Sequence, residues 1–212
     1  MYGTARKAYI DILTELVKEE SPTLYLEDFL YYFNKAISEF IKRRYELFEV
    51  TQQVHDDLRF WKKPHRTTKT RFKLDDISSQ SYRHLVKCII DIELTRPDRR
   101  CDHKVNTIKQ YKGVRMTSDI KSGILNNTYL EAQFFRPYFD IVDNHIEVIL
   151  GDIDSKSVKI SNILIEYLCH PEEVNLTEEE VEADEDTSQI LELSTDVGDA
   201  INQICLSLII ER

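Results

Sequence analysis

The most regular pattern of hydrophobic positions lies in residues 23–63, which contain no glycine or proline. Its apolar side chains recur at steps of three and four residues, which places them on one face of an α-helix. The opposite face carries charged side chains, among them Lys35 and Glu39. We therefore predict one long helix, residues 26–49, that anchors the fold and buries Leu26, Phe29, Leu30, Phe33, Ile37, Phe40 and Ile41.

Three further helices are predicted around it. Thr4 is placed to cap a first amphipathic helix, and the short turn at Ser21 and Pro22 predicts that it packs antiparallel to the long helix as an αα-hairpin. Thr51 is the predicted cap of a short helix that ends at Pro64. Near the end of the chain, Ser194 or Thr195 caps a terminal helix, which we expect to pack on the hairpin through Val197, Ala200, Ile201, Ile204, Cys205 and Leu208.

After residue 74 the hydrophobic period changes from helical to alternating. Apolar residues alternate with polar ones in residues 90–94, and in residues 146–150 Ile146, Val148 and Leu150 alternate with Glu147 and Ile149, as half-buried strands require. Asp143 and Asn144 supply a turn before the second of these strands, and residues 158–168 form a third. A short helix is predicted from Thr117 through Ile120 and Ile124. The middle of the chain is therefore predicted to be a β-rich insertion.

These elements predict an α+β fold in which the N-terminal helical hairpin and the C-terminal helix form a helical bundle with a β-rich insertion between them. The expected segments are residues 1–64 for the hairpin and short helix, 65–171 for the insertion, 172–193 for an acidic loop and 194–212 for the last helix. A chain of 212 residues, 42% hydrophobic, is long enough to bury a core. We interpret the whole as one composite domain.

The charge is distributed unevenly along the chain. The formal net charge is -10, but residues 160–212 contain 14 acidic side chains and a single basic one, Arg212, whereas the preceding part is nearly neutral. Residues 172–187 hold nine acids and no base, which predicts an exposed loop that becomes ordered in an assembly. The asymmetry suggests an acidic face used for repulsion, solubility or docking rather than for general nucleic-acid binding.

Residues 59–73 are the opposite case, with seven basic residues and no acid. Because Phe60, Trp61 and Phe72 lie between these basic residues, the tract is compatible with contacts to a nucleic-acid backbone and with base stacking. We favour instead a solvated connector, or a patch that pairs with the acidic segment of a neighbouring subunit. Trp61 is assigned either to the core or hairpin edge or to ligand stacking.

Motifs for catalysis or cofactor binding are not found in the sequence. Five scattered glycines form no phosphate-binding loop or dinucleotide fingerprint. Cys101 with His103, and Cys169 with His170, lack the paired spacing of a structural zinc site. No segment has the length of a membrane span or the pattern of a secretory signal, so we expect free thiols in a reducing compartment. We predict a protein that is not an enzyme and needs no cofactor or metal.

The order of elements resembles the head-to-tail connector, or adaptor, proteins of tailed bacteriophages. The resemblance rests on the helical hairpin, the basic tract, the β-rich insertion, residues 165–174 (Ile-Glu-Tyr-Leu-Cys-His-Pro-Glu-Glu-Val), the acidic loop with Leu-Glu-Leu at 191–193 and the last helix. Residues 26–37 (Leu-Glu-Asp-Phe-Leu-Tyr-Tyr-Phe-Asn-Lys-Ala-Ile) and 115–127 (Arg-Met-Thr-Ser-Asp-Ile-Lys-Ser-Gly-Ile-Leu-Asn-Asn) are similar to the ring proteins below the portal of crAss-like phages.

The resemblance implies a structural virion protein, made in the bacterial host cytoplasm, that assembles as a ring, commonly of twelve copies. Such a ring binds the portal and other tail or ring proteins, extends the channel for double-stranded DNA without reading its sequence, supports tail attachment and contacts no membrane. A closed head-to-tail ring needs two different patches on each subunit. Our candidates for the subunit interface are Arg59, Lys62, Lys63, Arg66 and Lys69 with Glu178, Glu179 and Glu180.

For docking on the portal we predict the end of the last helix, Leu208, Ile209, Ile210, Glu211 and Arg212. The rival interpretation is a monomeric regulatory or nucleic-acid-binding module that uses residues 59–73.

Overall fold

The computed structural model describes residues 3–18, 24–47, 52–74, 82–97, 104–117, 136–149 and 158–211. Within these residues it is a mixed α+β protein with five α-helices and ten strands. The contacts divide the chain into two compact units. Unit 1 is made of Met1–Trp61 and Pro171–Arg212, and unit 2 is the intervening Lys62–His170.

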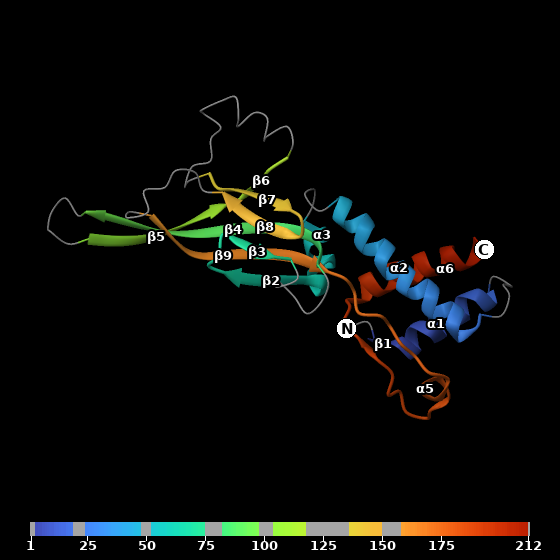
Figure 1. Ribbon diagram of the computed structural model, residues 1–212. Helices are drawn as coiled ribbons and strands as arrows, with labels where there is room; N and C mark the ends of the chain where they lie inside the picture. The colour runs from blue at the N-terminus through green and yellow to red at the C-terminus, as the bar shows by residue number, and fades with distance from the viewer. Residues whose placement is uncertain are drawn as a thin grey trace. The chain divides into compact units, whose positions relative to one another are not determined.

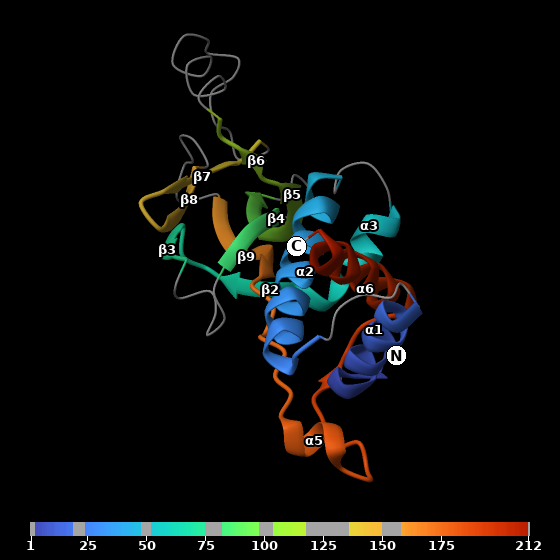
Figure 2. The same ribbon diagram turned by 90° about the vertical axis from the view of Figure 1, so that its right-hand side faces the viewer.

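Three helices supply most of the core of unit 1: α1 (Ala5–Lys18), α2 (Leu26–Glu46) and α6 (Thr195–Ile210). Helix α6 packs against both α2 and α1, as Figures 1 and 2 show. The long helix is confirmed, but it ends at Glu46, and residues 48–51 lie outside the described part of the chain. The buried side chains of the three helices include Ile12, Leu16, Phe29, Phe33, Ile37, Phe40, Ile41, Val197, Ile201 and Cys205. The predicted burial of Leu26 and Leu30 is wrong, because both are partly exposed, and Val17 on the apolar stripe of the first helix is 76% exposed.

Two predicted helix caps are confirmed. The Ser194 hydroxyl accepts a hydrogen bond from the Val197 N–H at 3.4 Å, and the Thr4 hydroxyl accepts one from the Lys7 N–H at 3.2 Å. Each satisfies a donor that the first turn of a helix leaves without an intrahelical partner.

The predicted short third helix is two elements, α3 (Gln52–Asp57) and the 3₁₀ turn η1 (Arg59–Trp61). It stops before Pro64 because Lys62 begins a strand. Trp61 is 7% exposed, and its ring centroid lies 6.1 Å from that of Phe40. Its assignment to the core is confirmed.

One sheet of unit 2 has the order β2-β9-β4-β5, in which every neighbouring pair is antiparallel. Its strands are β2 (Lys62–Thr67), β9 (Val158–Cys169), β4 (Tyr82–Pro97) and β5 (Lys104–Lys112). The prediction for residues 158–168 agrees with β9 to within one residue. The predicted alternation in residues 90–94 is confirmed, because Ile90, Ile92 and Leu94 are buried while Asp91 and Glu93 are partly exposed.

The second sheet of unit 2 has the order β3-β8-β7-β6. It contains β3 (Arg71–Lys73), β8 (His145–Ile149), β7 (Tyr138–Val142) and β6 (Val114–Arg115). Strands β7 and β8 are joined by Asp143 and Asn144, whose φ angles are 46° and 65°. Both residues tolerate this left-handed conformation, so the predicted turn is confirmed. The predicted helix through Ile120 and Ile124 lies outside the described residues.

The basic tract is not the turn or connector that the sequence predicted. Most of it forms β2 and β3, and β2 pairs antiparallel with β9 from Lys62 opposite Leu168 to Thr67 opposite Ile163. Strand β2 lies at the edge of its sheet, where proline is tolerated because one side of the strand needs no ladder partner. Pro64 therefore does not end an element but lies inside an edge strand.

Candidate interaction surfaces

The acidic arm, residues 172–187, is attached to the body of unit 1 at both ends. At its start, the Asn34 side chain forms two hydrogen bonds with the backbone of Val174: the amide nitrogen donates to the carbonyl oxygen at 3.1 Å, and the amide oxygen accepts from the N–H at 2.8 Å. Val174 and Leu176 are 3% and 4% exposed, so their side chains anchor the same end in the core. A long-range side-chain contact and two buried apolar residues thus fix the first stem of the arm.

The second stem of the arm continues into a short sheet. Strand β10 (Ile190–Leu191) pairs antiparallel with β1 (Gly3–Thr4). The Ala5 N–H donates to the Gln189 carbonyl at 2.9 Å, and the Gln189 side-chain oxygen accepts from the Asn175 N–H at 3.0 Å. This last bond joins the two stems, so the residues between them form a closed loop.

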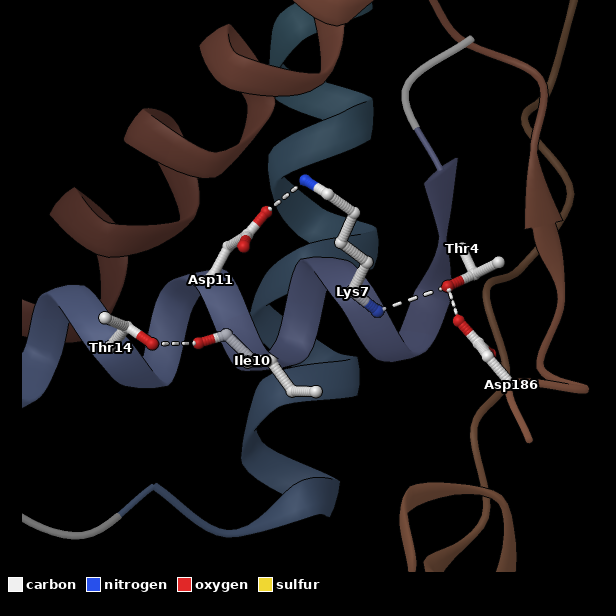
Figure 3. A network of polar contacts seen from close by, with 6 residues as sticks. All are labelled: Thr4, Lys7, Ile10, Asp11, Thr14 and Asp186. Carbon is white, nitrogen blue, oxygen red and sulfur yellow. Dashed lines mark hydrogen bonds and ion pairs between the residues drawn. The ribbon is translucent and has the colours of Figure 1, made fainter. Parts of the chain in front are cut away.

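Figure 3 shows how the start of α1 holds the arm through Thr4. The Thr4 hydroxyl accepts from the Lys7 N–H and donates to the Asp186 carboxylate. Asp186 also accepts from the Ser188 hydroxyl at 2.6 Å, and the Arg6 N–H donates to that hydroxyl at 3.1 Å. The hydrogen bonds from Ser188 and then from Thr4 lower the pKa of Asp186, because they favour its charged form.

The tip of the arm is helix α5 (Glu178–Glu182), which lies away from α1, α2 and α6 in both views (Figures 1 and 2). A reciprocal capping box begins it: the Thr177 hydroxyl accepts from the Glu180 N–H at 3.3 Å, and the Glu180 carboxylate accepts from the Thr177 N–H at 2.9 Å. Glu180 is therefore used within the helix. Glu178, Glu179 and Glu182 are exposed and form no ion pair with any residue that the structure describes.

The acidic segment was predicted to be an exposed loop, and the structure places the short helix α5 within it. Two stems and the capping box hold the segment within its own unit, and its further ordering in an assembly stays a prediction. The Thr-x-x-Glu pattern at residues 177–180 was a readable signal for this helix, but the density of like charges directed the prediction toward a loop. The contacts of Thr4 with Asp186, of Asn34 with Val174 and of Ser188 with Arg6 were not predicted, since the partners lie more than a hundred residues apart.

The predicted basic candidates differ in how accessible they are. Lys62 forms an ion pair with Glu166 of β9, with 2.8 Å between the ammonium nitrogen and the carboxylate oxygen. Lys63, Arg66 and Lys69 are exposed. Arg59 lies in unit 1, where its guanidinium lies over the Phe60 ring at 4.7 Å, whereas the other four lie in unit 2. Lys62, Arg59 and Glu180 thus already have intramolecular partners.

Lys63, Arg66 and Lys69 in unit 2 and Glu178, Glu179 and Glu182 in unit 1 are exposed. Charged groups of this kind contribute to the rate and the specificity of association more than to its affinity.

The predicted portal-docking residues lie at the end of α6. Leu208 and Ile209 are partly exposed, Ile210 is 56% exposed, and Glu211 is exposed. Arg212 lies outside the described residues. A shallow groove runs beside this end of the helix between α2 and α6, and it is lined by Phe40, Arg43, Arg44, Leu47, Ala200, Gln203, Ile204 and Ser207.

The side chains that most often carry chemistry are either buried or dispersed in the described residues. Cys88, Cys169 and Cys205 are buried free thiols, and burial raises the pKa of Cys88 and of Cys205 to about 12. In the same residues, no three His, Cys, Asp or Glu side chains gather as metal ligands. No helix in the described ranges is both long and apolar enough to cross a bilayer.

Comparison of the chain with known protein families and with curated proteins finds no match in either. The interaction surfaces are therefore interpreted from their own geometry and charge.

Proposed function

We propose that this chain is a ring-forming head-to-tail connector subunit of a tailed bacteriophage. It acts in the virion below the portal, where copies of the chain, twelve in the family that it resembles, extend the DNA channel and support the tail. The proposal rests on the structure of the acidic arm. The arm is held by contacts within its own unit, and Glu178, Glu179 and Glu182 form no ion pair with any residue that the structure describes. As part of the same proposal, α1, α2 and α6 form a helical bundle with the β-rich unit inserted between its segments.

A ring that closes by rotation joins one patch of each subunit to a different patch of the next subunit. The exposed residues Lys63, Arg66 and Lys69 and the acidic arm are opposite in charge, which suits such a contact. Because the arm is held by its stems before assembly, less conformational entropy is lost when it binds. A preformed arm therefore supports an assembly role better than a loop that must fold at the interface.

The charge contact is tested by reversing the exposed bases while keeping the internal ion pair. The double variant Lys63→Glu/Arg66→Glu should weaken ring formation, most strongly at low salt, because each arm would then face like charge. The control variant Lys18→Glu/Lys42→Glu changes the net charge equally on α1 and α2 and should assemble normally. Native mass spectrometry reports the copy number of each variant. Equal assembly of the two double variants at low salt would reject this interface.

The ring itself is tested with the unaltered chain. Connector subunits are expected to assemble on their platform, so native mass spectrometry is recorded for the chain alone and mixed with a portal ring. A multi-copy ring on the portal supports the proposal. Removal of residues 208–212 should abolish portal binding, because this deletion takes the exposed end of α6, while circular dichroism confirms that the shortened chain stays folded. Retained binding would reject α6 as the docking element.

The second candidate function is nucleic-acid binding by a monomer, and it is favoured by the exposed bases of β2, β3 and the residues between them. Lys63, Arg66, Lys69, Arg71 and Lys73 are exposed and lie close together in the sequence. A backbone-binding surface of this kind gives an affinity for short DNA duplexes that falls steeply with salt. A salt-dependent gel shift by a chain that stays monomeric with the portal ring would favour this function over the connector.

A further inference from the structure

Strand β5 lies at one edge of the larger sheet of unit 2. It pairs with β4 along its whole length, from Ile89 opposite Lys112 to Pro97 opposite Lys104, without a register shift. Among the residues that the structure describes, no strand pairs with its other side. Figure 1 shows β5 beside β4. A long edge strand is a template for another extended segment unless it is protected.

The register determines which backbone groups of β5 point outward. The Gly113 N–H donates to the Cys88 carbonyl at 2.9 Å, so these two residues form a hydrogen-bonded antiparallel pair. Such pairs alternate along the ladder, which places residues 105, 107, 109 and 111 in bonds to β4. The N–H and C=O groups of the intervening residues therefore point to the free side: Lys104, Asn106, Ile108, Gln110 and Lys112.

The side chains of β5 indicate the chemistry of a matching strand. Lys109 and Lys112 are exposed, and Ile108 is 63% exposed. If two copies paired antiparallel through this edge, the exposed Lys109 and Lys112 of both strands would gather in one short ladder, which brings like charges together. The opposite edge of the sheet, β2, carries Lys63 and Arg66, so pairing between β5 and β2 of another copy also brings like charges together.

We propose that the free edge of β5 binds an extended acidic segment of a partner protein by β-strand addition. The partner strand receives backbone hydrogen bonds from the outward groups of β5, packs an apolar residue near Ile108 and places carboxylates near the flanking lysines. The acidic arm of a second copy is not suited to this edge as it stands, because its tip is helical and its stems are paired within their own chain. The inference stands on β5 alone and does not depend on the ring.

The probe is a labelled nine-residue peptide in which Glu and Val alternate, with blocked ends. Fluorescence anisotropy should show that it binds at least tenfold more tightly than a Lys–Val peptide, and at least tenfold more tightly than a Glu–Val peptide with N-methylated alternate amides. Hydrogen exchange should show new protection of the backbone amides of 104, 106, 108, 110 and 112. The amides of 105, 107, 109 and 111 are already bonded to β4 and should change little.

Two proline variants separate the free edge from the paired edge. Ile108→Pro removes an outward N–H and should lower peptide affinity at least tenfold while the melting temperature stays close to that of the parent. Lys109→Pro removes an N–H bonded to β4 and should lower the melting temperature. If Ile108→Pro fails to fold, Lys109→Glu/Lys112→Glu replaces it and should reverse the preference toward the Lys–Val peptide.

Three results would overturn the proposal. Outward amides that are already protected in the free protein would show that the edge is covered. Equal binding of the methylated peptide would show that backbone bonds are not used. Concentration-dependent self-association that competes with the peptide would assign the edge to a second copy instead of a partner protein.

Discussion

Replacing Asn34 with alanine tests how the first stem of the acidic arm is held. The change removes both hydrogen bonds to Val174 and leaves the N–H and C=O of a residue that is 3% exposed without their partner. Each buried backbone group left unsatisfied costs about 1–3 kcal/mol. Allowing for water that reaches the partly buried Asn34 site, we expect a total loss of about 2–4 kcal/mol. For a chain of this length, that loss lowers the melting temperature by roughly 5–15 °C if unfolding is cooperative.

Two measurements check this prediction. Thermal unfolding by circular dichroism gives the change in melting temperature, and hydrogen exchange at the Val174 amide reports opening of the stem itself. The matched control is Asn175→Ala, because the Asn175 side chain makes one long exposed contact, 3.4 Å to the Glu173 carbonyl, and its backbone bond to Gln189 is kept. An Asn34→Ala protein that melts within 1 °C of the parent, with unchanged exchange at Val174, would refute the reasoning.

Two further predictions concern the second stem and the core of unit 2. Because the pKa of Asp186 is lowered in the folded state, its contribution to stability is present above its unfolded pKa of about 4 and is lost as pH falls through the folded pKa. The melting temperature should therefore fall less steeply with decreasing pH for Asp186→Asn than for the parent. Parallel curves of melting temperature against pH would contradict a stabilising role of the Asp186 carboxylate. Gly113→Ala places a Cβ 3.0 Å from a Phe139 ring carbon and 3.2 Å from the Cys88 sulfur, so we expect a loss of about 1–3 kcal/mol in denaturant unfolding. The double variant Gly113→Ala/Cys88→Ala should recover part of this loss. If it does not, the contact between the added Cβ and the Cys88 sulfur is not the source of the destabilisation.

The elements that depend on local patterns could be predicted from the sequence. Strand β9 is a run of alternating and β-branched residues that ends near Pro171, and the turn at Asp143 and Asn144 uses residues that tolerate positive φ. The cap at Ser194 is an equally local signal. In each of these cases, the residues that determine the structure are adjacent in the chain.

The elements that depend on distant partners could not be predicted. Strand β2 has a low intrinsic preference for extended structure, since it contains two lysines and a proline, and it is a strand because β9 supplies the ladder. The ion pair of Lys62 with Glu166 follows from the same register. The sign of the charge on each candidate surface could be predicted from composition. The sequence did not show which charged side chains already form ion pairs or hydrogen bonds within the chain, because these contacts depend on pairing between distant segments.

The division into one continuous and one discontinuous unit affects the order in which the chain folds during synthesis. Unit 2, Lys62–His170, is continuous, so all of its strands are translated before α6. Helices α1 and α2 are translated long before α6, which begins only at Thr195. Until then, apolar side chains such as Phe29 and Phe33 lack part of the surface that buries them in the folded chain. Contacts between segments so far apart in sequence form slowly, and uncovered apolar faces favour aggregation. Unit 1 is therefore the part of a newly made chain that stays incomplete longest.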